Sequence, residues 1–470
     1  MGKHKVSRRK FLGQASCAAI GTTTALNSML NLDMMGALTA PTLKPLRRSG
    51  DYKAMVCILL AGGNDSFNMV IPTSADQYNT YQTSRSNLAL PSGDLLPLNY
   101  TDDNGVNYGL HPAMPEVQQM FNAGKIAMLA NVGTLVQPTT KSEVISQSVP
   151  LPLGLLSHSD QAKHWQTSVP QSRSANGWGG RVADIVNSMN VNQNVSMGIS
   201  LGGTNIYQLG ANNTEYSIQN FGSGSVGIQV LDSPEFFEQV IGGGVESLLN
   251  QQYQDIFKQT YREKILSSQG QHTEFSQAID GVTPFATVFS DNSLSRDLSM
   301  VAKTIAANET LDMQRQTFFV TLGGWDHHDD VLDNQMAMLS IVSQAMNEFN
   351  SALEEIGMDD CVTTFTVSDF ARTLASNGNG TDHGWGGNCM VMGGAVAGGT
   401  IYGDFPDLAI GSDVEVGGGG VIVPGLSTDE YFAELAMWFG VQDSDMEYLL
   451  PNLDNFFNIG SGQPIGFMNL

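Results

Sequence analysis

Three aspartates, Asp65, Asp326 and Asp369, each stand a few residues after a short apolar run. Two histidines, His328 and His383, stand in loops of the same glycine-containing kind. Mixed carboxylate and imidazole ligands suit zinc, manganese or a related divalent ion, and calcium takes carboxylate oxygens. Carboxylates brought close together repel one another unless a cation lies between them. The sequence therefore predicts a site for divalent metal, zinc, manganese or calcium, with the number of ions open.

His327 and Asp382 lie next to these residues and extend the set of possible ligands. An alternative stays open for each acid, because an aspartate after a strand also caps the following helix or closes an Asx turn.

The elements that must position these side chains are three apolar runs at residues 54–60, 317–322 and 362–367. A short run that is apolar on both faces is typical of a buried strand in a parallel sheet. The carboxyl ends of such strands share one edge of the sheet, where ligands bind. We therefore expect the three runs to be parallel strands and the acids that follow them to converge.

Helical patterns lie between and after these strands, over residues 113–123, 157–167, 331–356 and 429–439. Residues 195–231 differ, because short strand-like segments there are broken by Gly, Asn and Ser, and polar helices follow to about residue 311. The pattern predicts an α/β fold over residues 41–470, with a central, mostly parallel sheet, helices on both faces and an inserted cap region at about 190–312.

Several short motifs together give a resemblance to a known family. In chain order they are Gly62-Gly63-Asn64-Asp65-Ser66-Phe67-Asn68, Ser157-His158, Gly177-Trp178-Gly179-Gly180-Arg181, Gly324-Trp325-Asp326-His327-His328, Ser368-Asp369-Phe370-Ala371-Arg372-Thr373 and Asp382-His383-Gly384. From about residue 50 to the end, the chain resembles the exported bacterial family labelled domain of unknown function 1501. That family is usually placed in the alkaline phosphatase and sulfatase superfamily. The resemblance implies an alkaline phosphatase-like fold with one or two divalent metals.

The superfamily pattern implies roles for individual residues. Asp65 matches the acid after the first strand, which binds one metal. Asp326 and His328 resemble the pair that binds the other metal, with His383 as the late histidine of that set.

Asp369 matches the acid of the superfamily's Asp-His pair, and Phe370 stands where that pair has its histidine. No histidine follows His383 in the chain, so the resemblance leaves the second metal site incomplete. His327 stands where the family often has Thr, which makes it either a substitute ligand or a solvent-facing side chain.

The nucleophile has three candidates. Ser157 stands at an expected helix start, where the helix N-terminus stabilises an attacking oxyanion, and His158 follows it. Ser66 directly follows Asp65. Water activated by the metal is the third possibility.

Three arginines, Arg85, Arg181 and Arg372, are candidates for binding a substrate anion, because guanidinium groups match tetrahedral oxyanions bidentately. Salt bridging at the surface is the alternative role for each of them.

The first forty residues predict an export signal. Ser7-Arg8-Arg9-Lys10-Phe11-Leu12-Gly13 precedes a weakly apolar stretch, which is the pattern of a twin-arginine signal. The sequence thus predicts a periplasmic or extracellular protein whose first partner is the twin-arginine export machinery.

The composition excludes some partners. The formal net charge is -24, which repels phosphate backbones and disfavours nucleic-acid binding. After residue 40 no segment reaches the length of uninterrupted apolar sequence that a membrane span needs.

Two functions remain. The first is a secreted metal-dependent hydrolase of phosphate or sulfate esters, with a small ester or a polysaccharide-type substrate. The second is a non-catalytic exported protein of the same fold that binds metal or a partner protein.

Overall fold

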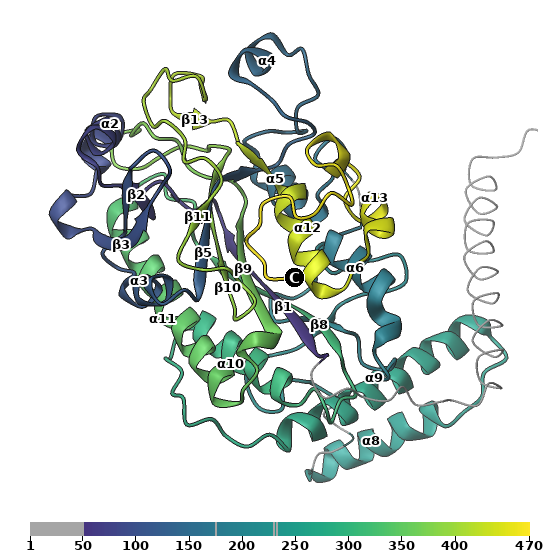
Figure 1. Ribbon diagram of the computed structural model, residues 1–470. Coiled ribbons are helices and arrows are strands. Elements are labelled where there is room, and N and C mark those ends of the chain that lie inside the picture. Colours follow the sequence, from purple (N-terminus) through teal and green to yellow (C-terminus); the bar gives the residue numbers. More distant parts are fainter. Residues whose placement is uncertain (1–50, 174–175, 229–230, 232–233) are drawn as a thin grey trace, which may run out of the picture. The chain divides into compact units, whose positions relative to one another are not determined.

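A nine-stranded sheet forms the centre of the molecule (Figure 1). The computed structural model describes residues 51–470 except 174–175, 229–230 and 232–233, so the expected export signal at 1–40 lies outside the described residues. The strand order is β11-β5-β10-β9-β1-β8-β6-β7, with β14 also paired to β5. Only β10 runs antiparallel to its neighbours, and the other pairs are parallel.

The first strand of the sheet, β1 (Lys53–Ala61), lies between β8 (Arg315–Gly323) and β9 (Val362–Ser368) and is parallel to both. Ala61 is level with Gly323, and Leu60 is level with Ser368. The loops that follow all three strands therefore leave the same edge of the sheet. This confirms the expected parallel topology.

Helices cover both faces because β1 is apolar on both. Its even-numbered residues from Ala54 to Leu60 join one hydrophobic cluster and its odd-numbered residues Met55, Cys57 and Leu59 join another. The first cluster includes residues of α3 (Pro115–Asn122), α10 (Ser293–Ala306) and α11 (Val331–Glu355). The second includes residues of α6 (Trp178–Val186), α12 (Thr428–Phe439) and α13 (Met446–Leu449). The predicted α/β class, with helices on both faces, is confirmed.

The four predicted helices are present with small shifts at their ends. The segment expected over 157–167 is α5 (His158–Thr167). Local signals explain the boundaries. A proline at N1 begins α3, and a capping box of Ser427 with Glu430 begins α12, which ends at the left-handed Gly440.

Part of the region 190–312, where the sequence predicts an insertion, belongs to the central sheet. Two of its strands, β6 (Gly198–Ser200) and β7 (Tyr216–Ser217), extend the central sheet beside β8, and α10 is buried in the first cluster. Both strands lie within residues 195–231, for which short strand-like segments were expected. Much of α8 (Phe236–Leu249) and the first half of α9 (Ile256–Asp280) remain solvent-exposed.

Smaller elements complete the fold. They are β2 (Val70–Pro72), α2 (Ala75–Arg85), β3 (Leu96–Thr101), β4 (Asn107–Leu110), β5 (Ile126–Gly133), α4 (Lys141–Ser146), β10 (Gly387–Met392), β11 (Ile401–Tyr402), β12 (Glu415–Val416), β13 (Val421–Ile422) and β14 (Leu426–Ser427). Among the described residues, no helix combines the length and the apolar character that crossing a membrane requires.

Candidate metal centre

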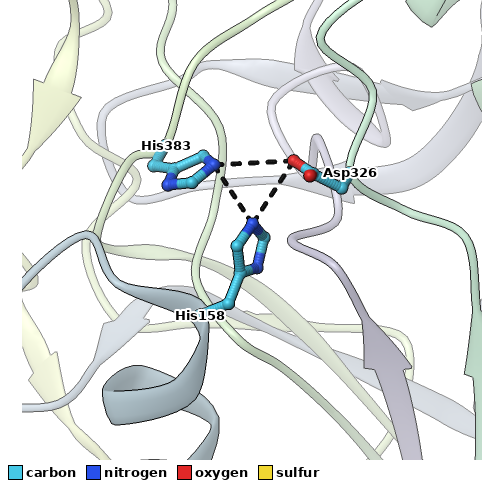
Figure 2. Close-up of side chains that lie close together, drawn as sticks. All are labelled: His158, Asp326 and His383. Carbon is cyan, nitrogen blue, oxygen red and sulfur yellow. Dashed lines mark hydrogen bonds and ion pairs between the residues drawn. The ribbon is translucent and has the colours of Figure 1, made fainter.

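Three side chains from separate loops converge at the carboxyl edge of the sheet. His158 begins α5, Asp326 lies in the loop after β8, and His383 lies in the loop between β9 and β10. The Nε2 atoms of His158 and His383 are 3.1 Å apart, and they lie 3.4 and 3.5 Å from Oδ1 of Asp326 (Figure 2). These three ligand atoms form one compact triangle.

A third imidazole adjoins this triangle. Nε2 of His328 lies 3.0 Å from Oδ1 of Asp326 and 3.0 Å from Nε2 of His383. Its Nδ1 lies 3.2 Å from Oδ1 of Asp382. His328 and Asp382 are both exposed, so this side of the cluster faces solvent.

Each imidazole has an oxygen acceptor at Nδ1. Asp369 Oδ2 lies 2.8 Å from Nδ1 of His158, and the carbonyl oxygen of Leu156 lies 2.7 Å from Nδ1 of His383. A carbonyl or an ionised carboxylate can only accept, so we assign the proton to Nδ1 in each ring. In the neutral rings, Nε2 then carries a lone pair. Several acceptor atoms thus face one another across about 3 Å, an arrangement that a cation stabilises.

The triangle fits a divalent metal. With metal–ligand bonds of about 2.0 to 2.2 Å, ligand atoms around a tetrahedral ion lie roughly 3.3 to 3.6 Å apart. The distances within the triangle are 3.1 to 3.5 Å. Metal-bound histidines usually donate the other ring N–H to a carboxylate or carbonyl, as His158 and His383 do here. A mixed His/Asp set favours zinc or another transition metal over calcium.

The electrostatics support this set of ligands. Burial raises the pKa of Asp326, but the hydrogen bond and charge of Arg372 outweigh it and hold the pKa below its usual value. Burial lowers the pKa of His383, so its ring is neutral at neutral pH, as a metal ligand must be. Burial raises the pKa of Asp369, and the hydrogen bond from His158 opposes this shift.

Close backbone packing holds the loops in place. Gly62 has a φ of 122°, and a Cβ there would lie 2.6 Å from the backbone nitrogen of Asp326. Leu156 has a φ of 71°, which non-glycine residues rarely adopt, and its carbonyl meets His383. The ring of Phe370 packs at centroid distances of 4.7 Å from His158 and 4.6 Å from His383.

Asp65, an expected metal ligand, is held elsewhere. Its carboxylate is fully buried and forms an ion pair with the equally buried Arg85, which also donates to the carbonyl oxygens of Thr373 and Leu374. Arg85 therefore compensates the charge of Asp65, as Arg372 does that of Asp326. The second oxygen of Asp65 has no hydrogen-bond partner among the described residues.

The candidate nucleophiles are not placed alike. Ser66 is buried, and its Oγ accepts from the backbone N–H of Asn388 at 2.9 Å. Ser157 precedes His158 as the N-cap of α5, but its Oγ makes no capping bond and lies 3.3 Å from Oγ of Ser159. Neither hydroxyl bonds to a residue of the triangle.

The three candidate anion-binding arginines are engaged inside the protein. Arg372 is buried and bonds to Asp326, to Thr381 and to the carbonyl oxygen of Gly62. Arg181 donates to three backbone carbonyl oxygens. Arg372 thus forms an ion pair with Asp326 from inside the protein, and Arg181 is bonded to the backbone, so neither guanidinium lies at the surface.

Two residues of the site were not expected as they lie. His158 was a candidate catalytic residue beside Ser157 and not a candidate metal ligand, whereas its imidazole joins the triangle. Leu156 was not expected to take part in the site. No sequence pattern predicts a positive φ at a leucine. His327 is buried, and its Nδ1 has no partner among the described residues, so it does not point to solvent.

A sequence profile described as "Protein of unknown function (DUF1501)" matches residues 52–416. The chain belongs to this family. The matched residues include all the members of the triangle. No curated protein matches the chain significantly.

Solved structures give weaker similarities to this member of the family. Ps i-CgsB, in complex with k-i-k-neocarrahexaose, is 11% identical, with 85% of this chain and 77% of that chain covered and a TM-score of 0.32. The lipoteichoic acid synthase LtaP from Listeria monocytogenes is 9% identical, with 69% and 59% covered and a TM-score of 0.27. The PsFucS1 sulfatase from Pseudoalteromonas sp. is 11% identical, with 84% and 68% covered and a TM-score of 0.30. Similarities of this strength support no conclusion about activity.

Proposed function

We propose that the chain is a secreted, metal-dependent hydrolase of phosphate or sulfate esters. The observation that carries this proposal is the triangle of His158, Asp326 and His383, with its ligand atoms at metal-binding distances. These residues would hold a zinc or manganese ion, with His328 beside them. A bound ion of this kind polarises an ester oxygen and lowers the pKa of a bound water. The ester class rests on the resemblance of the motifs to the alkaline phosphatase and sulfatase superfamily.

The surrounding residues favour water over serine as the nucleophile. Ser66 is buried and already bonded to Asn388. His328 is exposed and has Asp382 at Nδ1, so its Nε2 can accept a proton from a water that enters from solvent. Asp369 and the carbonyl of Leu156 keep the other two imidazoles fixed.

A non-catalytic metal-binding protein is the second candidate. It is favoured by the engagement of Arg85, Arg181 and Arg372, which leaves none of the three free for a substrate anion. Under this proposal the ion stabilises the loops at the edge of the sheet or presents them to a partner.

A turnover assay separates the two candidates. Metal-stripped protein is reloaded with zinc, manganese or calcium and tested on generic aryl phosphates and sulfates. Metal-dependent turnover that disappears in His383→Ala but survives in His272→Ala supports the hydrolase. His272 is a matched control because it lies on α9 and bonds to Ser225. Bound metal without turnover on any ester supports the second candidate.

The proposed location outside the cytoplasm has its own test. Replacing Arg8 and Arg9 together by Lys should leave unprocessed protein in the cytoplasm. Normal recovery from the periplasm would contradict export by the twin-arginine pathway.

A further inference from the structure

Asp65 is the residue on which a second metal ion would depend. The resemblance of the motifs implies one or two divalent ions, and it gives Asp65 to the ion that Asp326 does not bind. In the structure, the carboxylate of Asp65 is fully buried and forms an ion pair with Arg85, which is equally buried. A positive charge supplied by the chain itself therefore already lies against this carboxylate.

Arg85 is the last residue of α2, and this helix is fastened to the loop that carries Asp65. One turn earlier in α2, the hydroxyl of Tyr81 donates to Oδ1 of Asn68 at 2.8 Å and accepts from the backbone N–H of Leu90 at 2.9 Å. Tyr81 and Arg85 are both completely buried. The guanidinium is thus held in the protein interior by a packed helix.

Arg85 also links two loops at the carboxyl edge of the sheet. Its Nη2 pairs with Asp65 in the loop after β1. Its Nη1 donates to the carbonyl oxygens of Thr373 and Leu374 in the loop after β9, at 3.0 and 3.3 Å. The guanidinium therefore neutralises Asp65 and joins the two loops, which are the structural tasks of a bridging cation.

The surroundings of Asp65 do not fit a divalent ion. Zinc sites have three or four protein ligands, and among the described residues the group of three such side chains that meet is the triangle, which does not include Asp65. Phe370 stands where the superfamily pattern has a histidine. One oxygen of Asp65 has no partner among the described residues, but an ion bound there would lie close to the guanidinium of Arg85, and buried like charges repel strongly.

We propose that the guanidinium of Arg85 takes the place of a second metal ion, so that the chain binds one divalent ion, at the triangle. Asp65 is then a structural residue and not a metal ligand. A chelator removes an ion but not a side chain, so the charge of Asp65 stays compensated in the metal-free protein. The count of one ion rests on the metal centre proposed above, whereas the pairing of Asp65 with Arg85 does not.

Calorimetric titration of the metal-stripped full chain with zinc tests the metal count. We expect one ion per natural chain and none in His383→Ala. The double variant Asp65→Asn with Arg85→Met removes both charges and leaves no unpaired buried charge. It should still bind one ion, with a dissociation constant changed by less than about tenfold, the lower limit of the loss when a residue that supports a ligand is changed. Two ions per natural chain, or loss of an ion in the double variant, would overturn the proposal.

Urea unfolding in excess EDTA tests the pairing without any metal. Asp65→Asn and Arg85→Met should each lower the urea midpoint, and the double variant should lower it less than Arg85→Met alone, because a buried charge without its partner is strongly destabilising. The same three changes at the exposed pair of Asp291 with Arg296 are the control and should shift the midpoint little.

The measurement in EDTA also separates this inference from the proposed function. If an ion were the partner of Asp65, Asp65→Asn would leave the midpoint in EDTA unchanged or raise it, and that result would overturn the proposal. If the natural chain binds no zinc while both single variants lower the midpoint in EDTA, the metal centre is contradicted and the pairing of Asp65 with Arg85 stands.

Discussion

The carboxylate of Asp369 lies 2.8 Å from Nδ1 of His158, and Nε2 of the same ring points toward Asp326. Asp369 thus acts on the candidate metal centre through His158. The next residue, Phe370, packs against the His158 ring where the superfamily pattern would place a histidine. The two positions together orient an imidazole that comes from a distant helix.

Asp369→Asn should weaken metal binding by about 10-fold to 100-fold, because the variant holds the His158 ring less firmly and makes it less basic. Calorimetric titration of the metal-stripped protein with zinc measures this loss. The exposed Asp94→Asn is a matched control that should bind zinc normally. An unchanged affinity in Asp369→Asn would show that Asp369 does not position His158.

His328→Ala should retain bound metal at reduced affinity, whereas His383→Ala should lose it. His328 adjoins the triangle, but His383 is one of its three members. Metal content after extensive dialysis distinguishes the two variants. Equal metal loss in both would make His328 a full member of the ligand set.

Arg85→Met should destabilise the fold without removing the metal centre. Both partners of the Asp65–Arg85 pair are fully buried, and an unpaired buried charge costs about 3 to 5 kcal/mol. Urea unfolding measures the change, and Arg173→Met, which breaks an exposed ion pair with Asp160, should change stability little. The double variant Asp65→Asn with Arg85→Met should recover part of the loss. Full stability in Arg85→Met would contradict a structural role for the pair.

Asp429 should make stability depend on pH. Burial raises its pKa to about 7, against the opposing hydrogen bond from Ser168 and the charge of Arg181. Below about pH 4 the group is protonated in both states. Between about pH 4 and 7 only the unfolded chain loses the proton, so stability falls as the pH rises, by up to about 4 kcal/mol.

Asp429→Asn removes this titration. Relative to the natural chain, the variant should gain stability between pH 4 and pH 8, as measured by urea unfolding at each pH. A constant difference between the two proteins across that range would show that Asp429 does not titrate there.

The sequence predicted the strands and part of the site because their signals are local. The run 54–60 is apolar on both faces, and β1 is accordingly buried on both. Asp326 and His383 were expected in one coordination sphere, and their ligand atoms lie 3.5 Å apart. The pairing of Asp65 with Arg85 could not be predicted, because it depends on how α2 packs beneath the loop after β9. The same holds for His158, whose place depends on the path from β5 to α5.

Because β1 lies in the middle of the sheet, it pairs with strands that are synthesised much later than itself. This strand begins at Lys53, but the strands on either side of it end at Gly323 and Ser368. During synthesis, the backbone N–H and C=O groups along both edges of β1 therefore stay unpaired until most of the chain has been made. Unpaired strand edges of this kind are prone to aggregation. We expect the nascent chain to depend on a chaperone until residue 368 has left the ribosome.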